Sequence, residues 1–102
     1  MINQVIITGR LTQTPTSENI TIAVNRSYKN ADGIYETDFI SIKLSKNIAK
    51  NVMEYCRKGD LIGIRGSLET QPIDDGDGHI LAYAAIVVAD RVTFLSANKG
   101  GE

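Results

Sequence analysis

One helical segment stands in a chain whose other apolar residues alternate as they do in β-strands. Within residues 47–58, the apolar residues recur at helical spacing and form one stripe. The stripe consists of Ile48, Ala49, Val52, Tyr55 and Cys56. Ser45 or Asn47 is suited to cap the start, and residues 57–59 are typical of a helix end. We therefore expect a single helix with Tyr55 on its buried face.

Three alternating segments precede this helix. Residues 3–11, 20–25 and 35–44 predict half-buried strands, separated by the polar residues 14–19 and by the hairpin signal of residues 30–33. The side chains expected to face inward are Val5, Ile7, Leu11, Ile20, Ile22, Val24, Ile40, Ile42 and Leu44. In the third strand, Tyr35, Phe39 and Lys43 fall on the opposite face. Exposed aromatic rings beside a lysine favour a binding surface, although Tyr35 and Phe39 would equally suit packing against a neighbouring subunit.

Two further strands follow the helix. Residues 61–68 predict a strand with Ile62, Ile64 and Leu68 on one face and Arg65 on the other, and residues 74–78 predict a hairpin tip. Residues 80–95 predict a long strand that is apolar on both faces. The order strand, strand, strand, helix, strand, strand is that of an OB-fold. An OB-fold is an all-β, five-stranded Greek-key barrel, here with one helix between strands three and four.

Composition limits the chain to one small domain. With 102 residues, the sequence allows an OB-fold over residues 1–95 and a short flexible tail over residues 96–102. We expect a cytoplasmic protein, because one cysteine cannot form an internal disulfide and no secretion signal or membrane-spanning run is present. A net charge of −1 means that nucleic-acid binding would need a local basic face.

The residue types in the sequence also argue against an enzyme or a metal-binding protein. We expect Cys56 to be a small buried apolar residue and His79 to lie on the surface. Asp74, Asp75 and Asp77 are more typical of a turn than of a calcium loop, because the closing Glu is missing. No nucleophile–base or carboxylate pair is placed together. We therefore expect no catalysis, no metal and no cofactor.

The motifs in this order resemble the bacterial and phage single-stranded DNA-binding proteins, and the resemblance covers residues 3–95. Residues 3–12 with Pro15 are similar to the family's first strand, residues 23–26 to its second and residues 38–40 to its third. The helix and the last two strands are matched at Ala49, Val52, Tyr55, Lys58, Gly59, Gly63, Gly66, Leu68, Tyr83, Val87, Val88, Ala89 and Val92.

The resemblance implies binding of single-stranded DNA with little sequence preference, by a homotetramer or a dimer, in replication, recombination and repair. Tyr28 and Phe39 fall where the family places base-stacking tryptophans, and Tyr83 matches a family tyrosine. The positions that the resemblance implies are at or near the phosphate path are Arg10, Arg26, Lys29, Lys43 and Arg65. Contacts with replication or recombination proteins are also implied, although the sequence ends without the acidic and apolar tip that recruits such partners.

Some positions depart from the family pattern. Ile73 and Ser45 stand where the family has aromatic residues, and residues 74–77 add negative charge to a hairpin that often wraps DNA. Since stacking contributes ~1–3 kcal/mol per base, we expect weaker binding that depends more on phosphate contacts. Two other functions remain open: a primosome-type OB-fold dimer that binds single strands, and an OB module used for protein–protein contacts.

Self-association is indicated independently of the resemblance. Ile6 faces opposite Val5 and Ile7, and Ile86 with Val88 opposes Val87, so both faces of two strands are apolar. In so small a domain, this pattern predicts that one of the faces is covered by another subunit.

Overall fold

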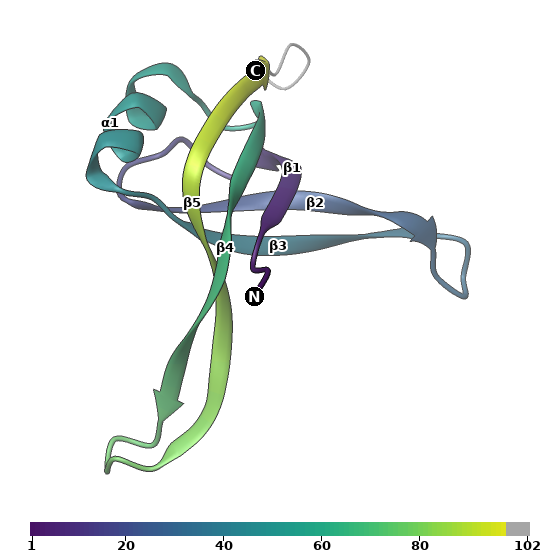
Figure 1. Cartoon of the computed structure of the whole chain (residues 1–102). Helices are drawn as coiled ribbons and strands as arrows, with labels where there is room; N and C mark the ends of the chain where they lie inside the picture. The colour runs from purple at the N-terminus through teal and green to yellow at the C-terminus, as the bar shows by residue number, and fades with distance from the viewer. Residues whose placement is uncertain (98–102) are drawn as a thin grey trace.

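The computed structural model describes residues 1–97, and in it five strands close into a barrel (Figure 1). The elements in chain order are β1 (Val5–Leu11), β2 (Asn19–Lys29), β3 (Tyr35–Lys43), α1 (Lys46–Tyr55), β4 (Leu61–Asp74) and β5 (Ile80–Ser96). Around the barrel the order is β1-β2-β3-β5-β4, and β4 also pairs with β1. The predicted OB-fold, with its helix between the third and fourth strands, is confirmed. The predicted tail lies, from residue 98 onward, outside the described residues.

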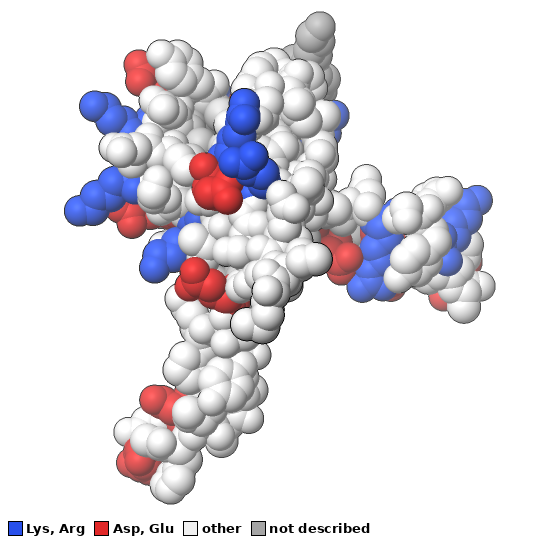
Figure 2. Space-filling view, viewed as in Figure 1, with Lys and Arg blue, Asp and Glu red and all other residues white. Residues whose placement is uncertain are grey.

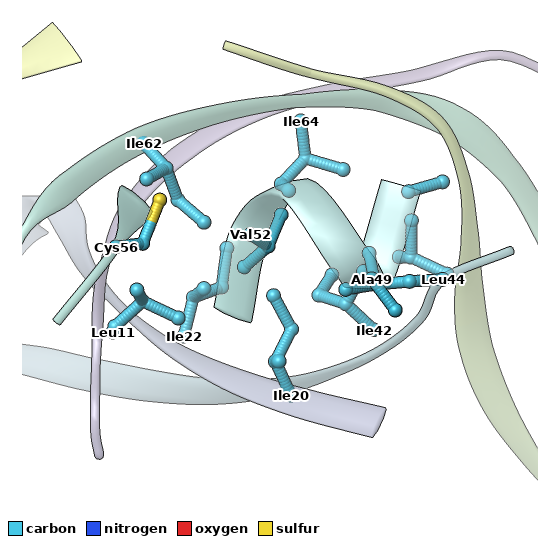
Figure 3. Packing of buried hydrophobic residues seen from close by; sticks show 12 residues of the cluster. Leu11, Ile20, Ile22, Ile42, Leu44, Ala49, Val52, Cys56, Ile62 and Ile64 are labelled. Atoms are coloured by element: carbon cyan, nitrogen blue, oxygen red, sulfur yellow. The ribbon is translucent and has the colours of Figure 1, made fainter. Parts of the chain in front are cut away.

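Strand alternation produces the core. Ile22, Ile42, Leu44, Ile62 and Ile64 are almost fully buried, and they converge from β2, β4 and the β3–α1 region in Figure 3. Two residues of α1, at positions 49 and 52, complete this cluster by covering one end of the barrel. The inward face predicted for each of the first three strands is therefore confirmed. No helix within residues 1–97 is long and apolar enough to cross a membrane.

The helix is shorter than predicted, and this places Tyr55 differently. The Ser45 hydroxyl accepts a hydrogen bond from the Ile48 N–H (3.3 Å) and caps the start. Cys56 leaves the helical conformation and donates its N–H to the Val52 carbonyl, so α1 ends at Tyr55. The prediction of a buried Tyr55 is wrong: its side chain is 69% exposed. As predicted, Cys56 is buried, and burial raises the pKa of its thiol.

Two hairpins project from the barrel (Figure 1). One consists of the outer parts of β2 and β3, and the other of β4 and β5, which remain paired out to Asp74 and Ile80. β4 is thus longer than the predicted strand 61–68. Leu68, predicted on the inner face with Ile64, is 50% exposed because it lies where β4 leaves the barrel. Gly66 takes the buried position before it, against the backbone of β5.

Candidate nucleic-acid interface

A row of side chains crosses the outer face of three neighbouring strands. Arg10 of β1 is in register with Ala23 of β2, and Ala23 is in register with Phe39 of β3. Adjacent strands lie ~4.8 Å apart, so the backbones of Arg10 and Phe39 are about 10 Å apart. Because Ala23 has only a methyl group, nothing large covers the Phe39 ring, which is 69% exposed. A cation and an open aromatic face therefore lie on one surface.

Lys43 extends this surface along β3. It follows Phe39 by four residues on the same face and lies opposite Asn19 of β2. With Ser41, Gln71 and other residues, it lines a groove of about 400 Å³ that reaches from the β2–β3 sheet to the base of the β4–β5 hairpin. Within residues 1–97, Lys43 forms no ion pair. Its ammonium group is therefore available to an anionic ligand.

The end of the β2–β3 hairpin carries two exposed tyrosines. The pairing of β2 with β3 is irregular between Asn25 and Lys29, and beyond this irregularity Lys29 lies opposite Tyr35. The Lys29 Nζ is 5.6 Å from the centre of the Tyr35 ring, a cation–π contact. Tyr28 is exposed beside this pair and is close enough to Arg26 to interact with its charge. Both tyrosine side chains are exposed to solvent.

Arg26 is already occupied by two carboxylates. Its Nε and Nη2 donate to Asp38 Oδ2 and Oδ1 (3.0 Å each), and its Nη1 donates to Glu36 (2.7 Å). The hydrogen bond with Asp38 raises the pKa of Arg26, and the same bond holds the pKa of Asp38 below its ordinary value. The group carries a net negative charge. A phosphate at Arg26 would have to compete with these carboxylates.

The remaining predicted residues lie away from the row. Arg65 is on β4, in register with Ile6, and its Nε donates to Asp90 (2.9 Å). Tyr83 is exposed on the β4–β5 hairpin, opposite Pro72. The structure thus brings together Arg10, Phe39 and Lys43, with Lys29, Tyr28 and Tyr35 further out on the same hairpin. It does not bring Arg65 or Tyr83 into that group.

Two features of the surface were not predicted from the sequence. Ala23 lies between Arg10 and Phe39 on the outer face and leaves the ring uncovered. This position depends on the register of β1, β2 and β3. Arg10 is held by a hydrogen bond from its Nη1 to the Gly59 carbonyl (2.9 Å), which orients the side chain without neutralising its charge. Neither the register nor this long-range contact leaves a signal in local sequence.

The acidic segment between β4 and β5 forms a turn, as predicted. The Asp75 carboxylate accepts hydrogen bonds from the backbone N–H groups of Asp77 (2.8 Å) and His79 (3.2 Å), and these bonds lower its pKa. The exposed His79 ring contributes a contact of 2.9 Å from its Nδ1 to Asp75. Among the described residues, no three side chains are grouped so as to hold a metal ion.

Comparisons with known proteins identify the family of the chain. The sequence profile described as "Single-strand binding protein family" matches residues 2–95. The chain is 39% identical over 104 residues to "Single-stranded DNA-binding protein B" of Bacillus subtilis (strain 168), an alignment that covers 93% of this chain and 91% of the relative. It is 40% identical over 111 residues to "Single-stranded DNA-binding protein 2" of Staphylococcus aureus (strain COL), covering 100% and 79%.

A solved structure shows the same fold. The chain in "Plasmodium falciparum SSB complex with ssDNA" aligns with a TM-score of 0.77 over 94% of this chain and 96% of that one, at 20% identity. The fold therefore agrees with the sequence match, which extends over nearly the whole chain. This chain belongs to the single-strand binding protein family.

Proposed function

We propose that the chain binds single-stranded DNA without sequence preference, by stacking bases on Phe39 and contacting phosphates through Arg10 and Lys43. The observation that carries the proposal is the exposed Phe39 ring in one row with Arg10, in a chain that belongs to this family. Every base has a face that can stack on an aromatic ring, and every nucleotide has a phosphate. Such a surface binds strands of any sequence and needs no catalytic group.

The outer part of the β2–β3 hairpin would extend the proposed path of the DNA strand. Tyr28 and Tyr35 offer further stacking surfaces, and Lys29 a further cation. We place this binding in the cytoplasm, on strands exposed during replication, recombination and repair. Ser45 supports the expectation of weaker binding than is usual in the family: it stands where the family has an aromatic residue and it caps α1, so it offers no ring to a base.

The test compares two exposed aromatic residues. Phe39→Ala removes the proposed stacking ring, whereas Tyr55→Ala removes an equally exposed ring from α1, outside the proposed path. Binding of a fluorescent oligo(dT) is followed by anisotropy. Phe39→Ala is expected to weaken binding by ~1–3 kcal/mol, about 5- to 150-fold, and Tyr55→Ala to leave it unchanged. Equal effects of the two substitutions would reject the stacking role of Phe39.

We also propose that the chain works as a homo-oligomer, a tetramer or a dimer, through the outer face of β1, β4 and β5. Ile6 is 73% exposed there and lines a groove of about 260 Å³ with Leu95 and Arg91. β1 is in register with β2 at only two positions, so the edge of β1 before Arg10 is open to another strand. Ile6→Asp should lower the mass measured by light scattering, and an unchanged mass would argue against this interface.

A further inference from the structure

Two arginines lie opposite each other on the outer face of β4 and β5. Arg65 of β4 is in register with Arg91 of β5 and, on its other side, with Ile6 of β1. Side chains directly opposite each other on antiparallel strands have Cβ atoms about 5 Å apart, and like charges at such positions destabilise the strand pair. This placement therefore indicates a negative ligand that both guanidinium groups can contact.

A bulge in β5 brings one carboxylate to this pair. Gly66, the next residue of β4, is in register with Ala89, so Asp90 is an extra residue that lies opposite Arg65 together with Arg91. Asp90 accepts a hydrogen bond from the Nε of Arg65 (2.9 Å). Within residues 1–97, Arg91 forms no ion pair. One carboxylate thus faces two guanidinium groups, and the three side chains keep a net positive charge.

The two arginines line the same groove on this outer face. The groove has a volume of about 260 Å³, and the hydroxyl side chains of Thr8 and Thr93 also line it. None of its described lining residues is acidic or aromatic. Figure 2 shows basic side chains over β4 and β5 beside an acidic patch. The groove therefore offers guanidinium and hydroxyl donors to an anion, but no ring on which a base could stack.

These donors suit a tetrahedral oxyanion such as phosphate. Guanidinium groups bind phosphate through paired, charge-assisted hydrogen bonds. Such an anion would contact Arg91 and compete with Asp90 for Arg65. The competition is weak, because Asp90 is 62% exposed and ion pairs at the surface contribute little to stability. Since a phosphate of a DNA strand would bring a base with it, a free anion fits this groove better than the strand does.

We propose that Arg65 and Arg91 bind a free phosphate-type anion, and that the bound anion favours association of two copies through this face. The second part rests on the homo-oligomer interface proposed above, which includes this groove, whereas the first part does not. A two-fold contact through this face brings the arginine pairs of both copies toward one another. An anion at each pair offsets their excess positive charge before it is buried. Association should then depend on phosphate itself and not only on ionic strength.

The first experiment measures phosphate binding directly. Inorganic phosphate is titrated into the ¹⁵N-labelled chain at constant ionic strength, with chloride as the balancing anion, and saturable shifts of the backbone amides around Arg65 and Arg91 are expected by NMR. Arg91→Gln should weaken the affinity on the order of tenfold, because charged hydrogen bonds are lost. Asp90→Asn should strengthen it by up to about fivefold, because the competing carboxylate is removed. Lys50→Gln removes an unpaired cation of α1 and is the matched control, with unchanged affinity.

The second experiment measures mass by light scattering over a range of protein concentrations, in phosphate and in chloride of equal ionic strength. Phosphate is expected to lower the concentration at which the unmodified chain and Lys50→Gln dissociate, but not that of Arg91→Gln. If Ile6→Asp lowers the mass but phosphate has no effect on dissociation, the interface stands and the proposed role of the anion is wrong. Equal phosphate shifts in Arg91→Gln and the unmodified chain would overturn the site itself.

A short oligo(dT) distinguishes the free anion from a phosphate of the strand. Arg91→Gln should bind it with the affinity and the salt dependence of the unmodified chain. A weaker salt dependence in Arg91→Gln would show that the arginine pair contacts the strand, and would overturn the proposal.

Discussion

At the residue scale, the cations near the proposed path differ in the partners that they already have. Arg26 is bound by the carboxylates of Asp38 and Glu36, and Arg65 by Asp90. Arg10 donates to a neutral carbonyl and keeps its full charge. Phosphate binding by a paired arginine requires the loss of an existing ion pair. The unpaired cations should therefore contribute more to DNA binding.

This difference predicts distinct salt dependences. A plot of log K against log salt concentration has a negative slope. Arg10→Ala and Lys43→Ala should each make this slope shallower by about 0.7, the value for one phosphate of a single strand. Arg26→Ala should change the slope less, because Asp38 and Glu36 already neutralise Arg26, so it replaces few counterions on the DNA. The slopes come from oligo(dT) titrations at several salt concentrations. A larger effect at position 26 than at position 43 would contradict this ranking of the cations.

Ala23 is expected to affect DNA binding, because its small side chain leaves the Phe39 ring uncovered. Ala23→Leu would place a branched side chain opposite Phe39, on the same face, and would occupy the space over the ring. Oligo(dT) binding should weaken about as much as in Phe39→Ala. Ala82→Leu, on the β4–β5 hairpin opposite Ile73, is the matched control and should have no effect. If both leucine variants bind like the unmodified chain, the Phe39 ring is not the stacking surface.

At the element scale, the β2–β3 hairpin is joined across its strands by the Arg26–Asp38 pair. Because the folded pKa of Asp38 lies below its ordinary value of 3.8, the pair stabilises the fold fully above that value. This stabilisation is lost as the pH falls through the lower, folded pKa. Asp38→Asn should therefore reduce the melting temperature near neutral pH and have progressively less effect below about pH 4. A melting-temperature difference that stays constant from pH 7 to pH 2 would contradict this assignment.

The pairing of β4 with β5 depends on a close backbone approach at Gly66. A Cβ at this position would lie 2.1 Å from the Val88 carbonyl oxygen, so the backbone itself would have to shift. Gly66→Ala should lower the free energy of unfolding by more than about 2 kcal/mol in urea titrations. At Gly63 the nearest atom would be 3.7 Å away, an ordinary contact, so Gly63→Ala is the control. Similar losses in the two variants would show that the close approach is not what makes Gly66 necessary.

Sequence alternation was enough to predict the elements, but not how far they extend. The inward faces of β1, β2 and β3 follow from the alternation of apolar residues along each strand. The order of strands and helix along the chain indicated the barrel. The continuation of β4 past Leu68 had no such signal, because residues 69–72 do not alternate and are held by pairing with β5. Tyr55 fits the helical stripe in the sequence, but the helix ends there and its side chain lies outside the core.

The site was less predictable, since it depends on contacts between strands. Phe39 and Lys43 could be placed on one face because they belong to one strand. The row that adds Arg10 depends on the register of three strands, and the pairing of Arg26 with Asp38 depends on the geometry of a twisted hairpin. Neither is encoded within a short window of sequence.

At the scale of the whole molecule, charge is divided among separate surfaces. The chain has a net charge of −1, yet unpaired cations lie on the outer face of the sheet and at α1, whereas the end of the β4–β5 hairpin is acidic (Figure 2). The proposed path for single strands therefore lies on a face with unpaired cations, away from the acidic end of that hairpin.

The most direct measurement is a titration of fluorescent oligo(dT) with the unmodified chain, with duplex DNA of equal length as competitor, at two salt concentrations. We predict binding that is weakened by salt and resistant to the duplex, because stacking on Phe39 needs unpaired bases. Equal competition by the duplex, or no binding at low salt, would contradict single-strand binding as the function of this chain.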